Sequence, residues 1–566
     1  MRAGGSLPAR DSYALGYFAG ERLLNGWGNE IMKSDELASR PYLSIPAEFN
    51  IARAIVDRHV AAGRGAKVAA WFDDRSYTYA ELRELSNRFA NGLRELGVQR
   101  GDRVMLRLGT NLHAMVAILG TLKLGAVVIP SSFLLREHEV EKILRNSDAV
   151  VAVSTPELAG PIEAVRSQTA LKHLILTGGA TASPSGRGEG NAMGWDLLME
   201  RASAEFIPAP TLAREPAFIM YTSGTTGEPK GVEHAHRWAL GTGDPVIREM
   251  IDLKPTDVCY QPQDWSFMYP LGSSFFHPLL AGATVVVNHG RFEPEKALAT
   301  IQRHGVTVFA AVPTIYRLLL AVPQAESRYH LGSLRLGMSA GEALPPDTFG
   351  QWRERFGVTI YDGLGQTEGH IFIANQLNMP IRPGSMGKPL RGYEAAVLND
   401  SGGLQARGTP GHLAIRNEDH PGLALGYRKD PERWAAVNRD GWYYTQDIAY
   451  IDDDGYYWYV ARSDDLIKSR AYLISPKEVE SALLEHPAIL EAAVVGIPDP
   501  ALTNKIRAFV TLKPGNEPSG GLAGQIRDYV RSVIAPYKVP QEIEFLSELP
   551  KTANGKILRR ELRARI

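Results

Sequence analysis

Apolar runs of strand length alternate with helical patterns through most of the chain, and this alternation constrains the fold more than any other feature. The runs expected to form strands are residues 68–71, 104–108, 150–153, 174–176, 283–287 and 306–311. Apolar residues at helical spacing fill residues 79–96, preceded by the capping-box pattern of Thr78 and Glu81, and residues 295–303. Strands alternating with helices predict an α/β domain of helix-covered, mostly parallel sheets.

The pattern changes near residues 460–465, and a smaller unit follows. Ser475 and Glu478 form a second capping-box pattern with Pro476 at the first helical position, which predicts a helix to about Leu484. Further expected elements are strands at residues 492–495 and 508–512 and a helix at residues 522–534. We therefore expect two domains, residues 1–461 and 462–566, the second a small mobile α+β domain joined by a polar hinge.

Length and composition fit a large globular protein. A chain of 566 residues exceeds the size at which a single core stops growing, and 44% apolar with 22% charged residues is ordinary for folded proteins. The net charge of −1 gives no reason to expect a nucleic-acid partner. The single cysteine, Cys259, excludes an internal disulfide and is expected to be a buried structural thiol.

No targeting segment or membrane span is expected. Residues 1–12 lack the apolar core of a signal peptide, and the longest apolar stretch, residues 114–129, is interrupted by Gly120, Lys123 and Gly125. That stretch is expected to be a helix running into a strand. These features favour a cytoplasmic protein. The sequence leaves open whether the protein forms a homodimer.

The segment from Tyr221 to His234 carries the clearest chemical signal. Residues 217–220 are expected to be a buried strand, and a loop rich in hydroxyls and glycine follows them: Thr222, Ser223, Gly224, Thr225, Thr226, Gly227 and then Lys230. Glycines let backbone N–H groups turn toward a phosphate, hydroxyls add donors, and the lysine supplies positive charge. The spacing is not that of a P-loop, and an ordinary glycine-rich turn is the alternative interpretation.

This segment resembles the phosphate-loop signature of the adenylate-forming superfamily of acyl- and aryl-CoA synthetases, peptide-synthetase adenylation domains and luciferases. Other motifs match it in the expected order from about Phe49 to Leu562. Besides the loop residues above, the resemblance implies nucleotide- or coenzyme-binding roles for Gly341, Glu342, Ala343, Asp362, Gly363, Leu364, Gly365, Gln366, Asp447, Arg462, Arg470, Ala471 and Tyr472. Among these, Asp447 corresponds to the aspartate that accepts the ribose hydroxyls, and Asp464 corresponds to the hinge.

The same resemblance implies the catalytic groups and the reaction. Lys556 matches the family's catalytic lysine, Thr367 can donate to a phosphate, and Glu368 with Thr225 would hold Mg²⁺ through oxygen ligands. A carboxylic acid would attack the α-phosphate of ATP to give an acyl-adenylate and pyrophosphate. Coenzyme A would then displace AMP to give a thioester, with rotation of the C-terminal domain between the two steps.

The acid itself is less constrained. Several motifs resemble benzoate-type aryl-CoA ligases and others resemble medium-chain acyl-CoA synthetases, so an aromatic, cyclic or medium-chain acid is expected. Its pocket would be drawn from Trp265, Phe267, Met268 and Tyr269, although aromatic residues in such runs are more often plain core.

Three residues depart from the common pattern of the superfamily. Gln446 replaces the usual glycine before Asp447, Ala471 replaces a glycine beside the pantetheine path, and Leu473 replaces an arginine. The Ala471 methyl group leaves two alternatives open: a ligase that loads a carrier protein from its adenylate, and a catalytically weakened ligand-binding relative.

Overall fold

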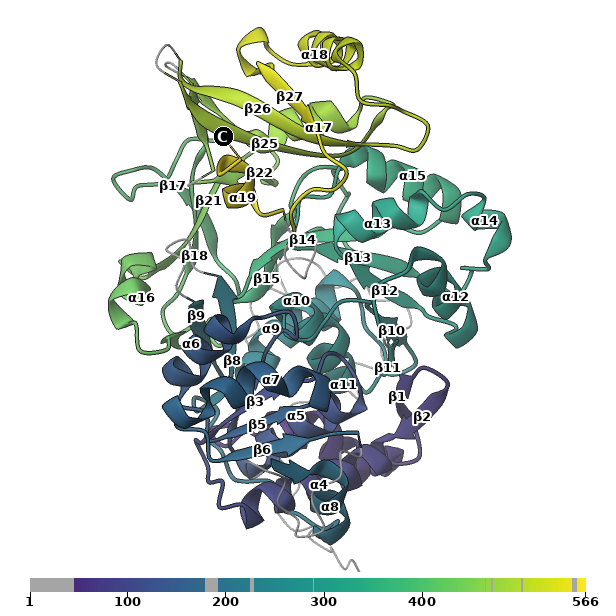
Figure 1. Cartoon of the computed structure of the whole chain (residues 1–566), viewed down its shortest axis with the longest axis vertical. Coiled ribbons are helices and arrows are strands. Elements are labelled where there is room, and N and C mark those ends of the chain that lie inside the picture. Colours follow the sequence, from purple (N-terminus) through teal and green to yellow (C-terminus); the bar gives the residue numbers. More distant parts are fainter. Residues whose placement is uncertain are drawn as a thin grey trace, which may run out of the picture.

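The computed structural model describes residues 45–178, 192–223, 229–288, 290–463, 465–469, 472–499, 502–551 and 557–565. Figure 1 shows a large lower body, coloured purple to green, and a smaller yellow unit above it. Two mostly parallel sheets form the large body, as the alternating pattern predicts. Within the described part of the chain, no helix is both long enough and apolar enough to cross a membrane.

The first sheet has nine strands. Its parallel centre is bordered by antiparallel strands at both edges, in the order β16 (Lys388–Pro389), β15 (His370–Ala374), β14 (Ile360–Gln366), β13 (Leu336–Ala340), β12 (Val308–Ala311), β10 (Val258–Tyr260), β11 (Thr284–Val287), β1 (Val68–Phe72) and β2 (Arg75–Thr78). Helices α12 (Pro294–His304), α13 (Pro313–Leu320), α14 (Ala325–Arg328) and α15 (Pro346–Phe356) follow its strands along the chain.

The second sheet has eight strands. The order is β19 (Gly426–Tyr427), β9 (Pro229–Ala235), β8 (Pro216–Ser223), β4 (Val127–Pro130), β3 (Arg103–Arg107), β5 (Val151–Ser154), β6 (His173–Leu176) and β7 (Ala192–Gly194). Strands β8 and β9 form an antiparallel pair, so the glycine-rich segment connects two neighbouring strands. The associated helices are α6 (Glu137–Ser147), α7 (Pro156–Val165) and α8 (Trp195–Arg201).

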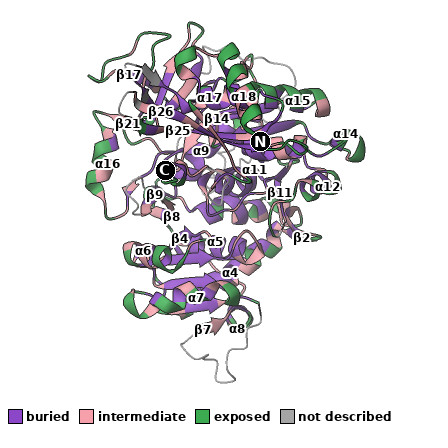
Figure 2. Cartoon of the chain, turned by 45° about the horizontal axis from the view of Figure 1, so that its top comes forward, coloured by how far each residue is buried: buried purple, intermediate pink, exposed green. Residues whose placement is uncertain are grey.

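One apolar core joins the two sheets. It gathers side chains from β1 and β11 of the first sheet and from β3, β4 and β8 of the second, together with α4 (Tyr79–Glu95) and α5 (Leu112–Leu124). The capping box at Thr78 forms as expected, and the apolar stretch at residues 114–129 is indeed helix α5 followed by strand β4. Figure 2 shows this buried interior in purple, while α16 (Pro431–Val437) and α7 carry exposed faces.

A third sheet leads toward the smaller unit. Strands β17 (Ala395–Leu398), β18 (Gly411–Arg416), β20 (Asn438–Arg439), β21 (Trp442–Ile451) and β22 (Tyr457–Arg462) pair antiparallel. Between β9 and this sheet, the chain also forms α9 (Trp238–Pro245), α10 (Met268–Leu271) and α11 (His277–Ala281). Strand β22 ends at Arg462, which is where the sequence predicts the polar hinge.

The smaller unit has its own core. It contains β23 (Ile467–Ser469), β24 (Tyr472–Ile474), α17 (Pro476–Leu484), β25 (Ile489–Asp499), β26 (Thr503–Leu512), α18 (Gly520–Val533), β27 (Glu542–Phe545) and α19 (Arg559–Arg563). The buried apolar residues of these elements pack with one another rather than with the large body. The expected α+β composition is therefore present, and the boundary at residues 461 and 462 remains our proposal.

Ion pairs join the last helix of this unit to its first residues. In α19, Arg559 donates to Glu480 of α17 at 2.6 Å, and Arg563 donates to Asp465 at 2.7 Å. An isolated antiparallel bridge between Lys551 and Ile557 precedes this helix. Helix α19 therefore lies close to the first residues of the smaller unit, beside the expected hinge.

Strand β14 begins at Ile360 and contains the glycine-bearing motif of residues 361–366, because that motif pairs with β13 and β15. One local prediction is wrong in part. Ser475 caps the amide of Glu478 as expected, yet the reciprocal half of the capping box is missing. The Glu478 carboxylate accepts instead from Lys538. Local sequence does not predict this ion pair, because the two residues lie 60 positions apart.

Candidate active site

Lys230 and Glu368 meet where the two large sheets approach each other. Lys230 lies at the start of β9, Glu368 follows β14, and their side chains form an ion pair of 2.7 Å. Tyr427 of β19 donates its hydroxyl to the same carboxylate oxygen at 2.7 Å, and the lysine nitrogen lies 4.4 Å from the centre of its ring. The two residues that the phosphate and metal motifs single out are therefore in direct contact.

Burial and charge act in opposite directions on Glu368. Its side chain is 6% exposed, and burial alone opposes ionisation. The charge of Lys230 and the hydrogen bonds from Lys230 and Tyr427 outweigh burial and lower the pKa of Glu368 below its usual value. Glu368 is therefore a carboxylate at neutral pH, which is the form that binds a divalent cation.

A hydrogen-bonded chain links the end of β14 to the third sheet. Tyr443 donates to Gln366 Oε1 at 2.6 Å, and the Gln366 amide donates to Asp447 Oδ2 at 2.6 Å. Arg462 of β22 donates to Asp447 Oδ1 at 3.2 Å. Asp447 is buried, so these neighbours fix the orientation of its carboxylate before any ribose hydroxyl arrives.

Asp362 is a buried acid of β14, in the motif that leads to Gln366. It lies opposite Ser339 in the register of β13 and β14. Burial raises the pKa of Asp362 to about 7. It is therefore the buried carboxyl group of this motif whose protonation changes near neutral pH.

The loop after β13 is shaped for close approach. Gly341 has a φ of 90°, and a side chain built there would meet only Val312, at 3.5 Å. Glu342 accepts from the hydroxyl of Thr314 at 3.0 Å, which holds the next residue of the loop against α13. Ala343 follows directly, so the segment expected to lie against adenine is a bare, anchored turn.

The glycines of β14 are required by packing. A Cβ at Gly365 would lie 1.5 Å from the carbonyl oxygen of His370, and one at Gly363 would lie 2.9 Å from Ile371. Leu364 between them is half-buried. These glycines allow β15 to fold back against β14, and so they serve the fold whatever ligand they contact.

The four residues expected to line the acid pocket divide into two groups. Met268 and Tyr269 lie on α10, which packs against β14 and β15, and the hydroxyl of Tyr269 donates to Met338 at 3.0 Å. Trp265 faces another direction, because its ring nitrogen donates to Ser274 at 3.1 Å. Phe267 precedes α10 and is half-buried.

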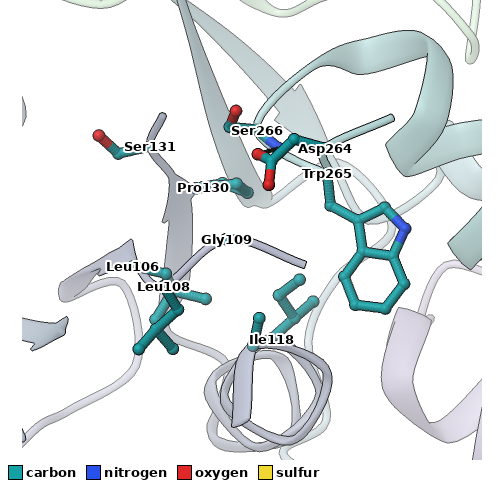
Figure 3. A pocket seen from close by; sticks show the side chains of 10 residues that line it. Leu106, Leu108, Gly109, Ile118, Pro130, Ser131, Asp264, Trp265 and Ser266 are labelled. Atoms are coloured by element: carbon teal, nitrogen blue, oxygen red, sulfur yellow. Dashed lines mark hydrogen bonds between the residues drawn. The ribbon is translucent and has the colours of Figure 1, made fainter. Parts of the chain in front are cut away.

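Trp265 borders a small separate pocket. Figure 3 shows Asp264, Trp265 and Ser266 on one side of it and apolar residues on the other: Leu106 of β3, Leu108 just after β3 and Ile118 of α5. Thr110 holds this segment by donating to Asp264 at 3.0 Å and accepting from the Trp265 amide at 3.0 Å. Trp265 thus packs between this pocket and the apolar core.

Part of the expected site lies outside the described residues: Gly224, Thr225, Thr226, Gly227, Arg470, Ala471, Lys556 and the hinge residue Asp464. Thr222 is described, and it pairs with Lys230 across the β8–β9 ladder. Ser223 and Tyr472 are described only as members of β8 and β24. Thr367 is half-buried in the turn between Gln366 and Glu368.

Two tyrosines of the site were not anticipated from sequence. Tyr427 lies on a two-residue strand far along the chain from Glu368, and no local pattern identifies it. Tyr443 lies in β21, four residues before Asp447. Its role could have been inferred, because strand alternation places Tyr443, Thr445 and Asp447 on one buried face.

The donor set around Glu368 fits magnesium rather than a metal held wholly by protein. Among the described residues, no cluster of three or more His, Cys, Asp or Glu side chains could hold a metal ion. Mg²⁺ commonly takes one or two carboxylates and completes its coordination with water and substrate phosphates. A single buried carboxylate such as that of Glu368 meets that requirement.

Comparison with known proteins agrees with this geometry. Residues 57–428 match the family model described as AMP-binding enzyme, and residues 478–556 match the AMP-binding enzyme C-terminal domain. The chain is 37% identical over 535 residues to the benzoate–CoA ligase of Thauera aromatica, covering 94% of this chain and 99% of that protein. It is 37% identical over 537 residues to human mitochondrial acyl-coenzyme A synthetase ACSM3, covering 92% and 90%.

Solved structures give the same result. The anthranilate CoA ligase AuaEII in complex with anthranoyl-AMP superposes with a TM-score of 0.85 at 35% identity, covering 94% of this chain and 99% of that one. A benzoate CoA ligase from Burkholderia xenovorans LB400 superposes with a TM-score of 0.82 at 32% identity, covering 91% and 100%.

Proposed function

The chain belongs to the AMP-binding enzyme family, and we propose that it is an AMP-forming, ATP-dependent carboxylic acid–CoA ligase. The observation that carries this proposal is the contact between Lys230 and Glu368, the two residues assigned to phosphate and metal binding, although 138 positions separate them in the chain. Asp447 and Arg462 lie beside Gln366 in a position suited to the ribose. These contacts between motifs that lie apart in the chain support the proposal of a single nucleotide site.

In the first step, an oxygen of the acid attacks the α-phosphorus of ATP, and the bond to pyrophosphate breaks. Lys230 and the adjoining glycine-rich segment bind phosphate oxygens, while Asp447 accepts the ribose hydroxyls. Lys556 supplies positive charge where the carboxylate and the α-phosphate meet. Mg²⁺ on Glu368 and Thr225 would neutralise phosphate charge.

In the second step, the thiol of coenzyme A loses its proton, attacks the acyl carbon and releases AMP. We assign the domains to residues 1–461 and 462–566, so that rotation about the segment after Arg462 withdraws Lys556 before this step. The resemblance to the superfamily implies that Arg470, Ala471 and Tyr472 take part in binding coenzyme A at this step. Separate cores in the two units support such rigid-body motion.

We assign the acid to a compact class: an aromatic, cyclic or medium-chain carboxylate. Met268 and Tyr269 on α10, with the nearby buried His370, offer a partly aromatic wall beside the glycines of β14. The solved relatives act on benzoate and anthranilate, as their names state. A cytoplasmic location and a homodimer complete the proposal, and sedimentation of the purified chain tests the latter.

The test is pyrophosphate exchange across benzoates, cyclic acids and short- to medium-chain fatty acids, with thioester formation measured in parallel. We expect both activities with at least one acid. Exchange without thioester would favour the alternative in which the adenylate is loaded onto a carrier protein. Neither activity with any acid, despite ATP binding, would favour the weakened ligand-binding relative.

Lys556→Ala separates the two half-reactions. Adenylate formation should fall by roughly 10²-fold or more, because one preorganised charge at a developing anion contributes that much. Thioester formation from preformed acyl-adenylate should survive. An equal fall in both half-reactions would contradict the two-conformation mechanism.

A further inference from the structure

Gln446 has an unfavourable backbone conformation at the edge of the nucleotide site. It lies in β21 with a φ of 62°, in the left-handed region that side chains with a Cβ rarely adopt. The superfamily usually has glycine at this position, and glycine would adopt this conformation without strain. We propose that Gln446 is a positioning residue that holds Arg462 against the ribose-binding carboxylate, an inference that rests on the proposed function.

The side chain of Gln446 has a defined partner. Arg462 Nη2 donates to Gln446 Oε1 at 3.1 Å. The Nη1 of the same guanidinium donates to the carbonyl oxygen of Thr445 at 2.9 Å and to Asp447 Oδ1 at 3.2 Å. Three successive residues of β21 therefore accept hydrogen bonds from one guanidinium. Because that group is planar and rigid, acceptors on both of its terminal nitrogens define its orientation.

The backbone of Gln446 also contacts Ser463, the residue that follows Arg462. The amide of Ser463 donates to the Gln446 carbonyl oxygen at 2.9 Å. Gln446 thus binds Arg462 through its side chain and Ser463 through its backbone, and these two residues directly precede the expected hinge. These contacts attach the first residues of the 462–566 domain to β21, at the base of the expected rotation.

Glycine at position 446 would keep the hydrogen bond from Ser463 to the backbone and lose the hydrogen bond from Arg462 to the side chain. Gln446 therefore strains the backbone, and its side chain gives Arg462 an acceptor in addition to Thr445 and Asp447. The consequence is specific: the side chain contributes to nucleotide affinity while it lowers the stability of the fold. A residue with a purely structural role would not combine these opposite effects.

Three variants separate backbone strain from the hydrogen bond. Gln446→Gly removes both, whereas Gln446→Met keeps the strain and the length but removes the acceptor. Gln324→Gly is the matched control, because Gln324 is also exposed, also has a positive φ (51°) and makes no side-chain capping bond. It precedes α14, at the right-hand edge of the large body in Figure 1, away from β21.

The readouts are the dissociation constants of ATP and AMP by calorimetry and the melting temperature. We expect Gln446→Gly and Gln446→Met to weaken nucleotide binding about threefold to tenfold, the effect of losing one typical hydrogen bond, because Gln446 is exposed and acts through Arg462. Gln446→Gly and Gln324→Gly should each raise the melting temperature by about one degree, and Gln446→Met should not. Gln324→Gly should leave nucleotide affinity unchanged.

Unchanged nucleotide affinity in both Gln446 variants would overturn the proposal. So would a loss in Gln446→Gly that Gln446→Met does not share, because backbone freedom would then explain it. Calorimetry needs no carboxylic acid, so the result stands even if no acid supports turnover. Failure of the proposed function and failure of this inference are therefore distinguishable.

Discussion

Two lysine–carboxylate pairs of similar length can be compared: Lys123 with Asp57 in the core of the large body, and Lys230 with Glu368 at the proposed nucleotide site. The Lys123 nitrogen lies 2.9 Å from Asp57 and also donates to Asn87 at 2.7 Å, and its side chain is wholly buried. At the site the order is reversed: Glu368 is 6% exposed and Lys230 is 17% exposed. In the core pair the lysine is the more deeply buried partner, whereas in the site pair the glutamate is.

This reversal indicates what each pair serves. A fully buried ammonium with two oxygen partners connects α5, α4 and the segment before them, and no ligand can reach it. Lys230 at the proposed site is partly exposed, and its charge, its hydrogen bond and the hydrogen bond from Tyr427 keep the Glu368 carboxylate ionised. Amide substitution of the two carboxylates should therefore affect different properties.

The largest effect is expected at the core pair. Asp57→Asn leaves the buried Lys123 ammonium without its counter-charge, and breaking a buried pair in this way costs about 3–5 kcal/mol of unfolding free energy. Burial already lowers the pKa of Lys123 to about 8, so the variant should lose that proton more readily. Denaturant unfolding measures the loss; a change below about 1 kcal/mol would contradict the comparison.

The matched change at the site, Glu368→Gln, should act on catalysis. We expect adenylate formation, measured by pyrophosphate exchange at saturating Mg²⁺, to fall by roughly 10²–10³-fold, because removing one electrostatic stabiliser of the transition state has this effect. Unfolding free energy should change by less than about 1 kcal/mol, since Lys230 can be hydrated. Destabilisation equal to that of Asp57→Asn would make the pair structural.

Asp362 extends the comparison to a buried carboxyl group that forms no ion pair within the described part of the chain. Burial raises the pKa of Asp362 from its usual value of 3.8 to about 7, so the folded protein keeps a proton that the unfolded chain loses. Stability should therefore fall as pH rises from about 4 to 7. At 1.36 kcal/mol per pKa unit, the advantage of Asp362→Asn should grow by about 2–3 kcal/mol between pH 5 and pH 8.

Urea unfolding of wild type and Asp362→Asn at the two pH values provides the measurement. Gln351→Glu, on the exposed face of α15, is a control for the general effect of a new carboxylate. A gap between wild type and Asp362→Asn that does not change with pH would show that Asp362 is ionised at pH 5 in the folded state.

Local patterns predicted the elements well where a single segment carried the signal. The apolar spacing and capping box of α4 identified that helix, and the glycine-rich motifs identified Lys230 and Glu368. Tyr427 escaped because its place beside Glu368 depends on β19 pairing with β9, a contact between segments far apart in sequence. The strain at Gln446 was not predicted either, because the sequence shows glutamine in place of glycine but not the positive φ of that residue.

The pairing of Asp465 with α19 has a consequence for measuring the proposed rotation. Points close to a pivot travel short arcs, and distant points travel long ones. Helix α19 lies beside the first residues of the smaller unit, whereas α18 lies at its far upper edge in Figure 1. A fluorophore pair that links α18 to the large body should therefore report domain turning with a large signal, while the same probe on α19 should remain nearly silent.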